Sequence, residues 1–131
     1  MTFVSLDELL AQSDIVSLHC PLNDESRGMI HAGTIAKMKL GALLINAARG
    51  PVVDSQALAD ALNSGRLGGA GIDVFEMEPP VPQDHPLLHA KNTIVTPHVA
   101  FATAESMEAR CHIVFDNLKA WMEGSPVNRV L

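Results

Sequence analysis

Three polar residues stand out because each directly follows an apolar stretch and because their chemistries complement one another. They are Arg49, Glu78 and His98. A guanidinium binds a carboxylate through two parallel hydrogen bonds and polarises a neighbouring carbonyl. An imidazole gives or takes a proton near neutral pH, and a carboxylate bonded to its other nitrogen fixes the tautomer and favours the protonated ring. The set fits the reduction of a 2-keto acid, or the oxidation of a 2-hydroxy acid, by a hydride carrier.

Each of these residues also has a simpler interpretation. An arginine after a strand is often a solvated charge, and a carboxylate beside prolines is often a plain loop residue, so that Glu76 competes with Glu78. His98 is the strongest candidate of its type, because Pro97 stiffens the backbone before it. The remaining histidines have no partners at ligand spacing and are interpreted as loop, surface or packing residues: His19, His31, His85, His89 and His112. No metal site is predicted.

The element that delivers Arg49 is an apolar run at 42–46. It lies between Gly41 and Gly50-Pro51, and it suits a parallel strand covered on both faces. Ligands of open parallel sheets bind beyond the carboxyl ends of the strands. Glu78 and His98 follow two further strands in the same way. Because neighbouring strands lie about 5 Å apart, the three side chains are expected in one crevice.

The rest of the chain alternates helix and strand. Strands are predicted at 14–20, 42–46, 67–75 and 92–96, and helices at 5–12, 26–39, 55–64 and 103–123. This rhythm predicts an α/β fold with a parallel sheet of about four strands, right-handed crossovers, flanking helices and a long C-terminal helix. We expect residues 1–123 to form one part of a domain and 124–131 to be an extended tail.

The strand at 14–20 is apolar enough for a central position, although it begins almost at the N-terminus. Its open edge suggests that neighbouring strands are missing. Either the chain is a fragment of a longer protein, or a second subunit covers the edge, and we expect a homodimer through it.

Composition narrows the class of protein. The chain has 131 residues, of which 47% are hydrophobic, and a net charge of −6, which argues against a nucleic-acid surface or an anionic membrane as partner. Two cysteines form neither a metal spacing nor a disulfide framework, and no membrane-length apolar run occurs, so a cytoplasmic location is expected. The glycine cluster at 65–71 follows a helix and precedes a strand, the reverse of a dinucleotide fingerprint.

Several motifs together carry a family resemblance. In this order and spacing, the chain has SDIVSLHCPL, MKLGALLINAARGPVVD, GGAGIDVFEMEPP and NTIVTPHVA. They resemble the second half of the Rossmann-like nucleotide-binding domain of the NAD-dependent D-2-hydroxyacid dehydrogenases, and the resemblance covers almost the whole chain. It implies NAD as cofactor, with NADP left open because the residue that decides between them is absent.

The resemblance also implies roles for single residues. Arg49 would bind the substrate, Glu78 would be the carboxylate partner, and His98 would be the acid/base. Glu78 is chosen over Glu76 because the family has its acid directly before proline. The implied cofactor-binding residues are Cys20 and Pro21 on the adenosine side, Ala47, Ala48 and Arg49 close to the cofactor, Asp73 on the nicotinamide amide, and His98, Ala100 and Phe101 near the nicotinamide.

Within the family, HVAFATAESMEAR is most similar to the glycerate dehydrogenase and hydroxypyruvate reductase type. The phosphoglycerate type remains open, whereas formate dehydrogenases have a glutamine where Glu78 stands. The family's phosphate-binding loop lies upstream of these residues, so we expect the polypeptide alone to have little activity. The alternative is a non-catalytic, cofactor-sensing or self-associating module of the corepressor type, which would not need the arginine, glutamate and histidine together.

Overall fold

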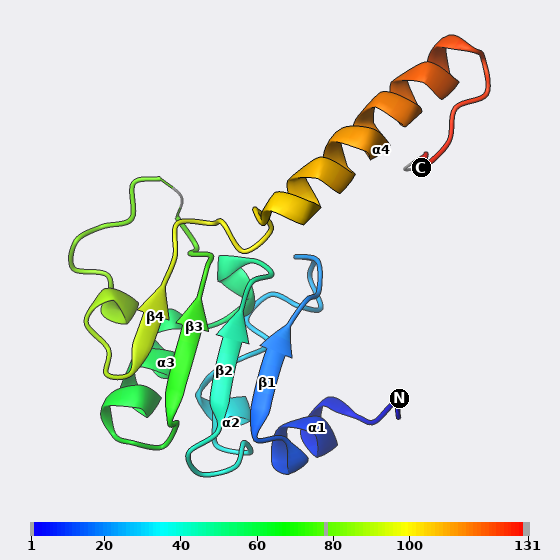
Figure 1. Cartoon of the computed structure of the whole chain (residues 1–131). Helices are drawn as coiled ribbons and strands as arrows, with labels where there is room; N and C mark the ends of the chain where they lie inside the picture. Colours follow the sequence, from blue (N-terminus) through cyan, green and yellow to red (C-terminus); the bar gives the residue numbers. More distant parts are fainter. Residues whose placement is uncertain (1, 78, 130–131) are drawn as a thin grey trace. The chain divides into compact units, whose positions relative to one another are not determined.

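A computed structural model of the chain describes residues 2–77 and 79–129. The chain divides into two compact units, residues 1–98 and residues 99–131, and each is described by itself. The first unit contains every strand that the described residues form. The second contains one long helix (Figure 1).

The first unit is built on a four-stranded parallel sheet whose strands lie side by side in chain order (Figure 1). The strands are β1 Ile15–Leu18, β2 Leu43–Asn46, β3 Gly69–Ile72 and β4 Thr93–Val95, and the helices are α1 Leu6–Gln12, α2 Ala32–Ile35 and α3 Ser55–Asn63. Short 3-10 turns, η1 Gly50–Val52 and η2 Pro86–Leu88, follow β2 and precede β4. The predicted parallel sheet with flanking helices is confirmed, although each strand is shorter than expected.

Local signals in the sequence set the ends of two helices, close to the predicted bounds of 5–12 and 55–64. Ser5 and Glu8 form a reciprocal capping box at the start of α1, with the Ser5 backbone N–H donating to Glu8 Oε2 at 3.0 Å. Asp54 accepts a hydrogen bond from the Ala57 N–H at 3.0 Å and so caps α3. Gly65, with φ of +76°, ends that helix in the left-handed conformation that glycine adopts most easily.

The prediction of a mostly helical segment at 26–39 is wrong, because only α2 forms there. The Asn23 side chain accepts the N–H groups of Glu25 and Ser26 and holds a turn instead. Ile30 then forms a parallel bridge with Val53, and its N–H donates to the Val52 carbonyl at 3.0 Å. These bonds take the backbone groups that a continuous helix would have used.

One face of the sheet is covered, so the expectation that the strand at 42–46 is covered on both faces is wrong for the described residues. Each crossover steps to the next strand in the same direction, and right-handed crossovers of this kind put their helices on one side (Figure 1). Val16, Leu44 and Ile72 point to that side and are at most 3% exposed. On the opposite face Ile15 is 59% exposed and Ile94 is 72% exposed.

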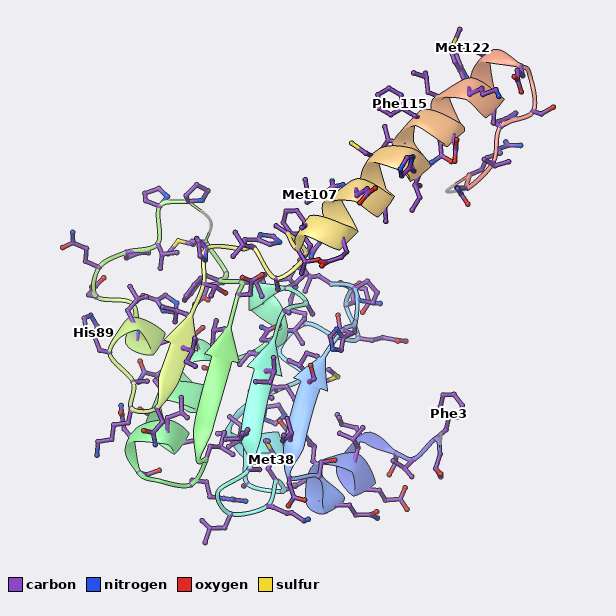
Figure 2. All side chains as sticks on the ribbon, viewed as in Figure 1. Phe3, Met38, His89, Met107, Phe115 and Met122 are labelled. Carbon is purple, nitrogen blue, oxygen red and sulfur yellow. The ribbon has the colours of Figure 1, made fainter. Side chains whose placement is uncertain are left out.

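The second unit consists of α4, Ala104–Met122, with short segments at either end. Thr103 and Ser106 form its capping box, and Gly124 follows with φ of +76°, so the predicted helix is confirmed. The side chains of Met107, Phe115 and Met122 project from it and are exposed (Figure 2). None of the helices in the part of the chain described here is long and apolar enough to cross a membrane.

Candidate functional site

The carboxyl ends of β2, β3 and β4 all lie at the same end of the sheet (Figure 1). This end is called the strand edge below. In the register of the ladder, Asn46 is opposite Ile72 and Ile72 is opposite Val95. Arg49, Asp73 and His98 therefore each follow within three residues of that common row. With strands about 4.8 Å apart, three adjacent strand ends span about 10 Å, which is the size of a small-molecule site.

Asn46 shapes the turn that carries Arg49. Its side chain is 1% exposed, its Oδ1 accepts the Ala48 N–H at 3.1 Å, and its Nδ2 donates to the Arg49 carbonyl at 3.1 Å. The Arg49 guanidinium donates through Nη1 to the Ala48 carbonyl at 2.6 Å, and this residue is exposed to solvent. Sequence reasoning missed Asn46, although an amide at the end of an apolar strand was its visible signal.

Gly50 brings the Arg49 segment against the stretch that follows β3. A Cβ atom at Gly50 would lie 1.9 Å from the carbonyl carbon of Phe75 and 2.3 Å from the backbone nitrogen of Glu76. No side chain fits there, so the two backbones are in direct contact. The segment after Arg49 and the stretch at Phe75 and Glu76 therefore lie against each other.

His98 is held in an unusual backbone conformation next to Asp73. The sheet pairing continues beyond β4, with the Thr96 N–H donating to the Ile72 carbonyl and the His98 N–H donating to the Asp73 carbonyl, both at 2.9 Å. His98 has φ of +56°, in the left-handed region. A non-glycine residue in that region often marks a functional position.

Asp73 is buried at this edge. It is 6% exposed, and its Oδ1 accepts the Thr96 hydroxyl at 2.5 Å. A carboxylate in this position could accept the N–H groups of a ligand amide, which is the role that the family resemblance implies for Asp73. Ala47 is half-buried and Ala48 is buried, and each carries only a methyl side chain.

A cavity of about 360 Å³ opens at the same edge. It is lined mainly by apolar side chains, with Asp73, Thr96 and His98 as its polar groups. The other lining residues are Phe75, Pro79, Val81, Leu88, Val95 and Pro97. Its volume lies within the range of small-molecule sites, and a few convergent polar groups on apolar walls are typical of them.

The other predicted site residues are Cys20, Pro21, Glu78, Ala100 and Phe101. Cys20 and Pro21 follow β1 at the same edge of the sheet, and the Pro21 carbonyl accepts the Ser26 hydroxyl at 2.7 Å. Glu78 lies outside the described residues. Ala100 and Phe101 belong to the second unit.

Two further findings bear on ligands that the site could hold. Gly68 and Gly69 lie at the amino end of β3, where a Cβ at Gly68 would be 2.4 Å from the Gly41 carbonyl oxygen, so this glycine cluster serves packing. Within residues 2–77 and 79–129, no group of three or more histidine, cysteine, aspartate or glutamate side chains could hold a metal ion.

Glu76 and His85 form a pair that the sequence did not predict. His85 Nε2 lies 3.2 Å from Glu76 Oε1, and the Ser55 hydroxyl donates to Glu76 Oε2 at 2.9 Å. Burial raises the pKa of the Glu76 carboxyl. Hydrogen bonds from its own N–H, Ser55 and His85 lower the pKa by more than burial raises it, so that the net pKa lies below its ordinary value. Ionised Glu76 therefore stabilises the fold at pH values above the ordinary pKa of a glutamate. This contribution is lost as the pH falls through the lowered pKa of Glu76.

Residues 1–100 match the family model described as D-isomer specific 2-hydroxyacid dehydrogenase, NAD binding domain. The chain belongs to this family. The resemblance found in the sequence is thus confirmed, and NAD is the cofactor of the family's domain. The strand edge described above, with its buried carboxylate and small residues, fits such a group.

Relatives and solved structures agree with this assignment. A hydroxypyruvate reductase from Blautia hydrogenotrophica is 49% identical over 128 residues, which are 98% of this chain and 39% of that protein. A D-lactate dehydrogenase from Treponema pallidum superposes with a TM-score of 0.85 at 39% identity, over 97% of this chain and 42% of that one. An acyclic imino acid reductase in complex with NADPH and D-Arg gives a TM-score of 0.88 at 33% identity, over 98% and 40%.

These three proteins are named for different substrates. The chain spans 39% of the length of the hydroxypyruvate reductase that it matches. Family membership therefore identifies the domain and its cofactor, but it does not identify the substrate.

Proposed function

We propose that this chain forms the catalytic side of the NAD-binding domain in an oxidoreductase that interconverts a D-2-hydroxy acid and a 2-keto acid. The observation that carries the proposal is the common strand edge, where Arg49, Asp73 and His98 follow β2, β3 and β4, and where Asp73 and His98 line a cavity of about 360 Å³. We favour the glycerate and hydroxypyruvate type as substrates, because HVAFATAESMEAR resembles that group.

The proposed chemistry assigns one task to each residue. Arg49 binds the substrate carboxylate through its guanidinium and polarises the adjacent carbonyl. His98 gives a proton to that carbonyl oxygen during reduction and takes it back during oxidation. Glu78 is the carboxylate partner that holds the imidazole, and Asp73 accepts the amide group of the cofactor. The nicotinamide cofactor, when bound, supplies or accepts the hydride.

The proposal is tested by the Arg49→Lys variant of the protein that carries this chain. NADH-dependent and NADPH-dependent reduction of hydroxypyruvate, glyoxylate and pyruvate is followed by absorbance. We expect activity with the unaltered protein, and a KM for the keto acid that rises about 10- to 100-fold in Arg49→Lys, because lysine cannot form the two parallel bonds. Arg27→Lys, at another exposed arginine, is the matched control.

If none of these acids is reduced with either cofactor, the proposal fails and the corepressor-type module replaces it. Residues 1–131 alone are expected to turn over little substrate, because the phosphate-binding loop of the family is not among them. A homodimer formed through the outer edge of β1 is part of the proposal, and light scattering would then give twice the mass of one chain.

A further inference from the structure

A second carboxylate–imidazole pair lies at the base of the segment 76–85. Glu76 and His85 are the first and last residues of this segment, and they are joined through Glu76 Oε1 and His85 Nε2 at 3.2 Å. Ser55, the first residue of α3, donates its hydroxyl to the other oxygen of Glu76 at 2.9 Å. Ser55, Glu76 and His85 are called the clasp below.

The hydrogen bonds around His85 indicate which ring nitrogen donates and which accepts. The Leu87 N–H donates to Nδ1 at 3.3 Å, so this nitrogen carries a lone pair, and in the neutral ring the proton is on Nε2 and points to Glu76. The ring is 6% exposed and meets Phe75 edge to face, with the centroids 5.0 Å apart. His85 is therefore oriented and buried as a hydrogen-bond donor to Glu76.

The composition of the segment explains why side chains must close it. Pro79, Pro80 and Pro82 have no backbone N–H, and they cannot contribute donors to a ladder or a helix. A segment of this kind has few ways to order itself through its own backbone. The clasp supplies what the backbone lacks, because it joins both ends of the segment to each other and to α3.

The clasp also braces the cavity beside His98. Phe75 precedes Glu76 and packs on the His85 ring, and Leu88 is the last residue of the 3-10 turn η2, which His85 caps. Both side chains line the cavity, as does His98. We infer that Glu76 and His85 are positioning residues, whose hydrogen bond joins the stretch after β3 to the turn η2 and holds the cavity wall in the shape required for turnover. The expected effect of this hydrogen bond on turnover rests on the proposed function. Both oxygens of Glu76 are committed within the clasp, which separates its role from the one proposed for Glu78.

The first readout needs no enzyme activity. Hydrogen exchange of the amides in 76–85 is measured in the protein that carries this chain, with Glu76→Ala and Glu76→Gln. Loss of a hydrogen bond to a charged group is expected to speed exchange about 10- to 100-fold in Glu76→Ala. Glu76→Gln is expected to stay within about threefold, because an amide can accept from His85 and donate to the Ser55 hydroxyl. Asp84→Ala removes an exposed carboxylate from the same segment and is the control.

The second readout is kcat/KM for the keto acid. We expect Glu76→Ala to lower it and Glu76→Gln to restore most of it, which a residue that needs its negative charge for catalysis would not allow. Equal losses in Glu76→Ala and Glu76→Gln would overturn the inference, as would exchange in Glu76→Ala that matches Asp84→Ala. If Glu76→Ala folds poorly, His85→Ala is measured instead, and it must speed exchange in 76–85 for the inference to stand. Absence of dehydrogenase activity would count against the proposed function alone, because the exchange result does not depend on it.

Discussion

His98→Asn is expected to lower kcat for reduction of the keto acid by about 10²- to 10⁴-fold, the range of a lost general acid. Asparagine suits this test, since it tolerates the left-handed backbone conformation that His98 adopts with φ of +56°. The backbone bond from residue 98 to the Asp73 carbonyl should therefore persist. Stopped-flow and steady-state assays measure the loss.

The control for this substitution is His112→Asn, an exposed histidine on α4. It should leave kcat within about twofold of the unaltered protein, since surface substitutions of this kind usually change little. A His98→Asn protein that keeps its folded far-UV spectrum and its kcat would remove His98 from the mechanism. Cofactor affinity, measured by fluorescence of bound NADH, should change much less than kcat, because the imidazole acts on the substrate oxygen.

Gly50→Ala is expected to destabilise the protein strongly, by about 3 kcal/mol or more. The added Cβ would lie 1.9 Å from the Phe75 carbonyl carbon and 2.1 Å from its oxygen. These are backbone atoms of the stretch after β3, and they cannot turn away as a side chain can. Relief requires the Arg49 segment and the Phe75 segment to separate, which would also spread the candidate site. Urea denaturation measures the change.

Gly71→Ala is the matched control on β3. Its Cβ would meet the Cδ1 atom of Ile45 at 3.1 Å, which is the end of a flexible side chain. We expect a change of about 1 kcal/mol or less, because Ile45 can adjust its rotamer. A Gly50→Ala protein that unfolds at the same urea concentration as the Gly71→Ala protein would show that the two segments are not in the contact described.

Local patterns in the sequence were sufficient for most of the elements. Apolar runs between glycines and prolines located all four strands, and the Ser5–Glu8 pair, Asp54 and Gly65 located helix ends, because each of these signals acts within a few residues. The segment 26–39 was predicted wrongly because the contacts that shape it are not local. Its backbone pairs with residues 51–54, and no pattern within the segment reveals a partner that lies more than 20 residues away.

By itself, the sequence determined the parallel sheet, the family, and the placement of Arg49 and His98 just beyond two of the strands, because strand ends and motifs can be read along the chain. Only the tertiary structure decided which groups touch. Asn46 holds the Arg49 turn, Gly50 lies against Phe75, and Glu76 bonds to Ser55 and His85. Such pairings depend on the register and spacing of elements that are distant in the chain, and the residue types alone gave no sign that Glu76 pairs with His85.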